Sequence, residues 1–90
     1  MSTRPKDSLL EFPCDFPIKA MGEASFEFDA LVVGLVREHV PDLREGAVSV
    51  RESRGGKYLS VTVNIRATSQ QQIDEIYISL SGHERILMVL

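Results

Sequence analysis

Few side chains in this sequence are spaced for catalysis or metal binding. The chain has one cysteine, Cys14, and two histidines, His39 and His83, which lie far apart. A metal site or a cysteine nucleophile needs such residues close together, as in paired Cys or His motifs or a Cys beside a base. Cys14 lies between Pro13 and Asp15, with no basic neighbour to favour the thiolate. We therefore predict no catalytic residue, no metal, no cofactor and an inert Cys14.

The composition predicts one small domain outside the membrane. The chain has 90 residues, 43% of them hydrophobic and 26% charged, and a net charge of −3. This negative charge disfavours a nucleic acid or an anionic membrane as partner. The sequence contains no apolar run of about 18 residues, and its first residues lack the apolar stretch of a signal peptide. With a single cysteine, these features predict a cytoplasmic protein.

The clearest predicted element is a strand over residues 57–67. Apolar and polar residues alternate strictly through this run, which is typical of a strand with one buried and one open face. A shorter strand over residues 47–53 precedes it, and a glycine-containing turn joins the two as an antiparallel hairpin. Residues 16–21 predict another strand, ended by Gly22, and residues 85–90 predict a last one.

Two other segments have the helical period. Over residues 25–40, large apolar residues recur at spacings of three and four, and Ser25 is the expected N-cap. Gly34 lies inside this helix, where close packing against a strand would explain a glycine. A second helical stripe follows a capping box at residues 68–72 and ends near Gly82.

The order strand, helix, strand, strand, helix, strand predicts an α+β, ferredoxin-like βαββαβ fold. Right-handed crossovers place both helices on one face of a four-stranded antiparallel sheet, in the spatial order 4-1-3-2. Residues 9–90 are expected to form this single domain, and residues 1–8 a flexible N-terminal arm. Residues 9–12 could cover a sheet edge of their own molecule or reach a second copy, and we expect the former.

The sheet face opposite the helices is the first candidate binding surface. An RNA-binding sheet of this topology needs several aromatic residues, but Ser60 and Thr62 occupy the outward positions here. We therefore predict no nucleic-acid partner, and a face that is either solvated or paired with another copy in a homodimer. The candidate face residues are Lys19, Arg51, Tyr58, Ser60, Thr62, Asn64 and Arg66, with Met21, Ser49 and either Leu87 and Val89 or the alternate residues of the last strand.

Short segments spread along the chain share their residues with a known family. They are Leu9–Pro13, Phe16, Lys19–Gly22, Gly56–Tyr58, Ser60–Val63, Ile76–Tyr77 and Met88–Leu90. As a set, they resemble the YbeD-like family of small bacterial proteins over nearly the whole chain. The resemblance implies a ferredoxin-like fold similar to that of ACT domains, the small ligand-sensing modules attached to amino-acid metabolic enzymes. It implies no established activity and no catalytic residues, and for some members a genomic association with lipoate metabolism.

The similarity to ACT domains suggests a second candidate site, because the turn between first strand and first helix contacts a small ligand in those domains. The corresponding residues here are Met21, Gly22, Glu23 and Ser25. Free N–H groups at a helix start favour an anion such as a carboxylate, although Glu23 would repel it. The alternative is a glycine that allows a tight turn beside a serine cap.

These observations predict a non-catalytic cytoplasmic module with a regulatory or binding role, which senses a small molecule or docks on a metabolic enzyme. The fold, the missing catalytic constellation and the similarity to ACT domains all favour this interpretation. One alternative is a protein-interaction or dimerisation domain without a ligand. Another is a small enzyme whose pocket residues the sequence does not bring together.

Overall fold

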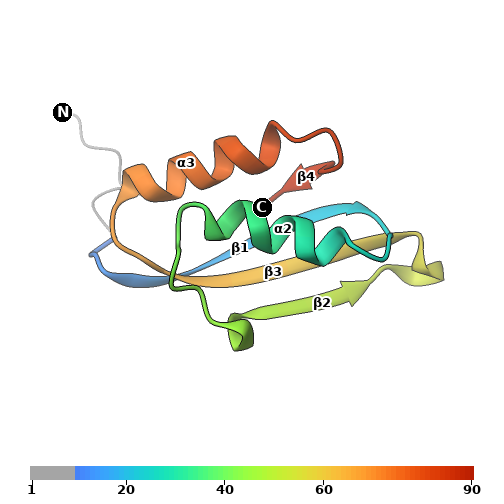
Figure 1. Ribbon diagram of the computed structural model, residues 1–90, viewed down its shortest axis with the longest axis horizontal. Helices are drawn as coiled ribbons and strands as arrows, with labels where there is room; N and C mark the ends of the chain where they lie inside the picture. The colour runs from blue at the N-terminus through green and yellow to red at the C-terminus, as the bar shows by residue number, and fades with distance from the viewer. Residues whose placement is uncertain (1–9) are drawn as a thin grey trace.

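The computed structural model describes residues 10–90, in which two helices cover one face of a four-stranded antiparallel sheet (Figure 1). The spatial strand order β2-β3-β1-β4 confirms the predicted ferredoxin-like α+β fold. The predicted arm at residues 1–8 lies outside the described residues. The elements are β1 (Cys14–Glu23), α2 (Phe28–Arg37), η1 (Glu45–Ala47), β2 (Val48–Glu52), η2 (Arg54–Gly56), β3 (Tyr58–Ala67), α3 (Gln70–Ser81) and β4 (Met88–Val89).

The central strands β1 and β3 pair antiparallel along all 10 residues of each strand. Gly22 was expected to end the first strand, and this is wrong, because Gly22 pairs with Leu59 and β1 continues for one more residue. The alternation predicted for β3 is confirmed. Val61, Val63 and Ile65 are buried under the helices, whereas the residues between them face the other side.

The edge strand β2 is shorter than predicted and barely covered. Its alternation placed Val48 and Val50 on the buried face, yet Val50 is 46% exposed. The helices pack mainly over the central strands, so the outer side of β2 meets solvent. The hairpin from β2 to β3 through η2 is confirmed.

The other edge strand, β4, comprises two residues instead of the six predicted for 85–90. Residues 82–87 are needed to turn the chain back from α3, and the Ile86 N–H bonds to the His83 carbonyl within this turn. Val89 lies opposite Ala20 and packs on the core. Because neighbouring residues of a strand face opposite sides, Met88 and Leu90 complete the open sheet face.

Helix α2 begins at Phe28, later than predicted, and Ser25 is not its N-cap. Glu27 occupies the N-cap position without a side-chain hydrogen bond, because the Ser25 hydroxyl accepts a hydrogen bond from Arg85 instead. The expectation that Gly34 packs closely is also wrong, since a Cβ atom there would meet nothing within 4 Å. The predicted apolar stripe of this helix is confirmed by its buried residues, Phe28, Val32 and Val36.

Helix α3 begins as the capping box predicts. The Ser69 hydroxyl oxygen accepts from the Gln72 N–H at 3.1 Å. The Gln72 amide oxygen accepts from the Thr68 N–H at 2.8 Å, one residue earlier than the standard reciprocal bond. Gly82 is the C-cap. The buried face consists of Ile73, Ile76 and Leu80, as predicted.

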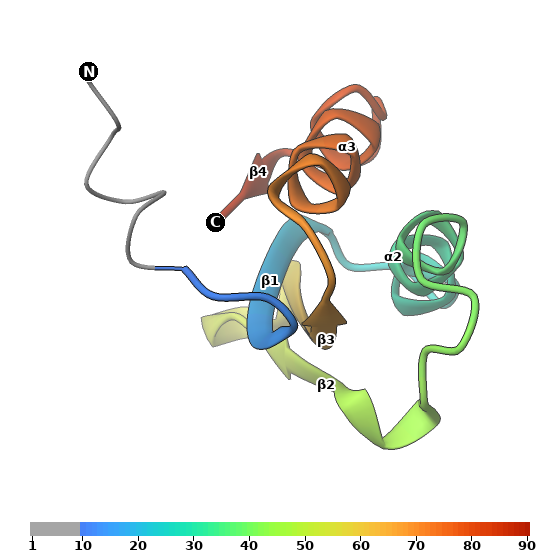
Figure 2. The same ribbon diagram turned by 90° about the vertical axis from the view of Figure 1, so that its left-hand side faces the viewer.

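Both helices lie on the same side of the sheet, which is clear when the molecule is viewed from its side (Figure 2). Among the described residues, every fully buried side chain is apolar. The core between sheet and helices therefore contributes stability, and candidate functional side chains lie at the surface. No helix within residues 10–90 has the length and apolar character needed to cross a membrane.

Candidate functional site

The turn that was predicted to bind a ligand is closed by its own packing. Gly22 is buried, and a Cβ atom there would lie 2.5 Å from the Arg85 carbonyl oxygen and 2.5 Å from the Phe28 ring. The Arg85 guanidinium donates to the Ser25 hydroxyl oxygen at 2.5 Å. It also lies 3.6 Å from the Glu27 carboxylate. Arg85 therefore occupies the space beside the start of α2 with both its backbone and its side chain.

The four residues of this turn do not converge on one cavity. Met21 lies on the open sheet face, whereas Gly22 faces the helices and Glu23 is exposed at the end of β1. Gly22, Glu23 and Ser25 line none of five separate hollows at the described surface. Packing accounts for the glycine without a ligand, and ligand binding by this turn stays a prediction.

The centre of the open sheet face brings together five of its seven predicted residues. Lys19, Arg51 and Ser60 line two adjacent hollows of ≈ 240 and ≈ 260 Å³, one shared with Tyr58 and the other with Thr62. Ammonium, guanidinium and hydroxyl groups suit a carboxylate or a phosphate. Both hollows are smaller than the roughly 300 Å³ at which ligand pockets begin.

Side chains at both ends of this face pair with one another. Arg66 forms an ion pair with Asp15 at 3.1 Å, and both residues line a hollow of ≈ 500 Å³ that also includes Asn64. At the opposite end of β3, the ammonium group of Lys57 lies 5.6 Å from the centre of the Tyr58 ring, where a base would otherwise stack. The structure thus separates Asn64 and Arg66 from the central residues of the face.

A larger hollow of ≈ 690 Å³ lies between α3, the start of β1 and the C-terminal residues, and we call it the α3 groove. Its volume falls within the range of about 300–1,000 Å³ found for ligand sites. One of its apolar lining residues, Ile78, is 71% exposed, and Leu90 lines both this groove and a hollow of the open sheet face. Clustered exposed aliphatic residues mark interaction surfaces more often than scattered ones do. The groove is lined by Leu10, Phe16, Gln70, Ile73, Asp74, Tyr77, Ile78 and Leu90.

The polar groups of the α3 groove are a carboxylate, an amide and a phenol. The Gln70 Nε2 group donates to Asp74 at 3.0 Å, while the Gln70 Oε1 atom is buried and has no hydrogen-bond partner among the described residues. The Tyr77 hydroxyl donates to the Leu90 carbonyl at 3.1 Å. Burial raises the pKa of Tyr77, so the phenol remains a neutral donor at physiological pH. No basic side chain is present in the described lining.

Sequence reasoning missed this groove because three separate segments form it. Ile73 and Tyr77 were assigned to the buried stripe of α3, and Tyr77 proves half-buried. Phe16 was placed on the inner face of the first strand, which is confirmed. It too is half-buried, because no strand of the described residues pairs with β1 beside it. Ile78 was the available signal, since it is an apolar residue outside the buried stripe.

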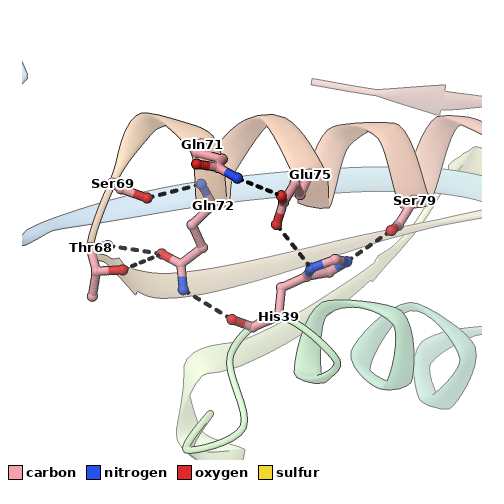
Figure 3. A network of polar contacts seen from close by, with 7 residues as sticks. All are labelled: His39, Thr68, Ser69, Gln71, Gln72, Glu75 and Ser79. Carbon is pink, nitrogen blue, oxygen red and sulfur yellow. Dashed lines mark hydrogen bonds and ion pairs between the residues drawn. The ribbon is translucent and has the colours of Figure 1, made fainter.

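A polar network connects the end of α2 with α3 (Figure 3). The His39 Nε2 atom lies 2.8 Å from the Ser79 hydroxyl, and its Nδ1 atom lies 3.9 Å from the Glu75 carboxylate. The Gln72 amide donates to the His39 carbonyl at 3.0 Å. Sequence reasoning left His39 as an isolated residue at a helix end, because Ser79 lies 40 positions further along the chain.

The order of serine, histidine and carboxylate in this network resembles a hydrolase triad, but the geometry differs. A separation of 3.9 Å is too long for the hydrogen bond that would orient His39. Ser79 lies within a helix, whose own hydrogen bonds use the neighbouring N–H groups that an oxyanion would need. We interpret the network as a link that positions α3 against α2. Within residues 10–90, no cluster of three or more His, Cys, Asp or Glu could hold a metal ion.

Comparisons with known proteins identify relatives of the whole chain. It is 52% identical over 85 residues to a UPF0250 protein of Chromobacterium violaceum, covering 94% of this chain and 96% of that protein. It is 43% identical over 89 residues to the UPF0250 protein RSc0326 of Ralstonia nicotianae, covering 99% and 92%. The solution structure of protein HP0495 from H. pylori has a TM-score of 0.72 over 100% of this chain and 98% of that chain, and its 15% identity supports the fold alone.

A family model covers nearly the same length. The model described as "Protein of unknown function (DUF493)" matches residues 7–90. Its match and the high identity of the UPF0250 relatives agree with the resemblance noted in the sequence. The chain therefore belongs to the DUF493, or UPF0250, family of small bacterial proteins, which is the YbeD-like family.

Proposed function

We propose that this protein is a non-catalytic docking module that binds a partner protein in the α3 groove. The observation that supports this most directly is the gathering of apolar side chains around the groove, where Ile78 remains 71% exposed. Removing such surface from water on association is favourable and roughly proportional to the apolar area buried. Docking on a metabolic enzyme through this groove would give the module a regulatory role.

The charge of the α3 groove favours a protein partner over an acidic small molecule. Asp74 contributes a carboxylate, and no Lys, Arg or His in the described lining balances it. An organic acid, including a lipoate-type acid, would therefore approach a negative charge inside an apolar surface. The groove therefore supports the binding of apolar protein side chains better than the sensing of anionic metabolites.

The polar groups of the groove also support a binding role more than a catalytic one. Asp74 accepts a hydrogen bond from Gln70, and the Tyr77 hydroxyl donates to a backbone carbonyl. No nucleophile with an adjacent base is present among these residues, although acyl and phosphoryl transfer both need activated groups. These contacts orient the groove wall.

The proposal is tested by affinity capture with three forms of the full-length protein. Ile78→Asp places a charge in the α3 groove, and Val50→Asp makes the same change at an exposed aliphatic residue on the opposite sheet edge. Partners captured from a Chromobacterium violaceum extract are identified, purified and titrated calorimetrically. We expect Ile78→Asp to weaken binding about 10-fold or more and Val50→Asp to leave it unchanged. A purified partner that binds Ile78→Asp as tightly as the wild type would refute the proposal, with circular dichroism confirming that both variants fold.

A further inference from the structure

Among residues 10–90, the outer edge of β1 is paired over only part of its length. β4 pairs with β1 at two positions, and the next residue, Lys19, exchanges N–H···O bonds of 3.1 and 2.8 Å with Leu90. Figure 1 shows β4 beside the later part of β1. The N–H and C=O groups of alternate residues point to the same edge of a strand. Asp15 and Pro17 therefore direct their backbone groups to the same edge as Lys19, where the described chain provides no strand partner.

The residues at this edge suit the addition of one more strand. Pro17 lacks an N–H group, so it leaves no donor unpaired, and proline is tolerated at sheet edges for this reason. The remaining groups are the N–H and C=O of Asp15 and the C=O of Pro17. An added strand could bond to all three, which is the backbone contribution that binding by strand addition uses.

The unpaired part of β1 borders the α3 groove. Phe16 lies between Asp15 and Pro17, whose outward backbone groups have no strand partner in residues 10–90, and it lines the groove together with Leu90. Directly opposed residues on neighbouring strands point to the same sheet face. Cys14 and Phe16 lie on this helix-covered face. The residues of an added strand that oppose Cys14 and Phe16 would therefore direct their side chains beneath α3. These positions are two residues apart in an extended chain.

On the basis of the proposed docking function, we propose that the bound segment of the partner is an extended strand, which pairs with β1 at residues 15–17. Two apolar side chains at positions i and i+2 fill the α3 groove. A backbone or side-chain N–H of this segment satisfies the buried Gln70 Oε1 atom, which lacks a partner among the described residues. A lysine or arginine beside the apolar pair meets the Asp74 carboxylate.

A helical partner segment fits these observations less well. A helix forms its backbone hydrogen bonds internally, so it would cover the β1 edge and leave the groups of Asp15 and Pro17 unpaired. Covering unpaired backbone groups without replacing their hydrogen bonds to water is unfavourable. An extended segment satisfies the edge and fills the groove at the same time.

The experiment selects random displayed peptides against the full-length protein and then measures amide hydrogen exchange with the tightest peptide. We expect enrichment of aliphatic residues at i and i+2 with a neighbouring Lys or Arg, and slower exchange of the Asp15 amide on binding. N-methylation of the peptide nitrogen that faces β1 should weaken binding about 10-fold, which corresponds to the loss of one backbone hydrogen bond. N-methylation of the adjacent nitrogen, which points away, should have little effect.

The variants of the docking test separate the two proposals. In one outcome, peptide binding requires Ile78 but tolerates both N-methylations, and the Asp15 amide exchanges as fast as in the free protein. This result would overturn strand pairing and leave docking in the groove intact. Peptides that bind Ile78→Asp and the wild type equally, or a selection that enriches no sequence, would overturn both proposals. An Asp15 amide that is already slow in the free protein would mean that the chain itself or a second copy covers the edge, which also overturns the proposal.

Discussion

Gly22→Ala should destabilise the protein, whereas the same substitution at Gly34 should stabilise it. A Cβ atom at Gly22 would lie 2.5 Å from the Arg85 carbonyl oxygen and from the Phe28 ring. Both atoms are about 1 Å closer than ordinary van der Waals contact allows. Phe28 is fully buried, and the Arg85 carbonyl belongs to the backbone, so neither can turn aside. The substitution must therefore displace the start of α2 or the chain before β4.

The expected magnitude follows from two opposing effects. Inserting a methyl group into a well-packed site costs about 1–3 kcal/mol, and we place this site near the upper end because two sides clash. Alanine also has fewer backbone conformations than glycine in the unfolded chain, and this stabilises the folded state by about 0.4–1 kcal/mol. The net expectation for Gly22→Ala is a loss of about 2 kcal/mol in the free energy of unfolding, or a fall in Tm of roughly 8–16 °C. Gly34 lies in α2 with open space around it, so Gly34→Ala should gain up to about 1 kcal/mol.

The assay is urea unfolding of both variants and the wild type, followed by far-ultraviolet circular dichroism. The two variants have identical composition and differ only in the position of one methyl group, so their comparison isolates the packing at Gly22. If the free energy of unfolding of Gly22→Ala lies within about 0.5 kcal/mol of the wild-type value, the packing argument is refuted. Changes of that size are typical of substitutions at exposed sites without specific contacts. Such a result would also reopen the turn at residues 21–25 as a flexible ligand site.

Two further predictions concern contacts of α3. In a double-mutant cycle, His39→Ala and Ser79→Ala should show a coupling energy of about 1 kcal/mol in urea unfolding, because their side chains lie 2.8 Å apart; additive effects would contradict the proposed link between α2 and α3. Tyr77→Phe should remove the bond to Leu90 and change the pH dependence. The raised pKa means that the folded state holds the phenolic proton more tightly, so this contribution is present below about pH 10 and is lost as the pH rises further. The wild type should thus lose more stability than Tyr77→Phe above about pH 10; equal losses would count against the assignment.

The fold was largely predictable because its signals are local. The alternation in β3 and the apolar stripes of the two helices each occupy one short segment, and the structure buries the residues that these patterns selected. The chain order of the elements, with right-handed crossovers, then leaves few possible topologies. The capping box at the start of α3 is equally local, since its partners lie within five residues.

The errors arise where a distant segment competes with a local preference. Ser25 is a reasonable N-cap by residue type, but its hydroxyl oxygen accepts a hydrogen bond from Arg85, which lies 60 positions further along the chain. Gly22 ends no strand, because Leu59 continues the pairing and Arg85 and Phe28 close around it. β4 is short because its neighbouring residues are used in the turn from α3.

The sequence by itself determined the core, since burial follows from the periodicity of apolar residues along each segment. It also placed Lys19, Arg51 and the β3 hydroxyls on one open face. Only the tertiary structure decided where exposed apolar side chains and unpaired backbone groups lie together. The α3 groove and the free edge of β1 depend on how far β4 extends and how α3 lies over β1. Those quantities are set by contacts between segments far apart in the chain, which leave no periodic trace in the residues that form them.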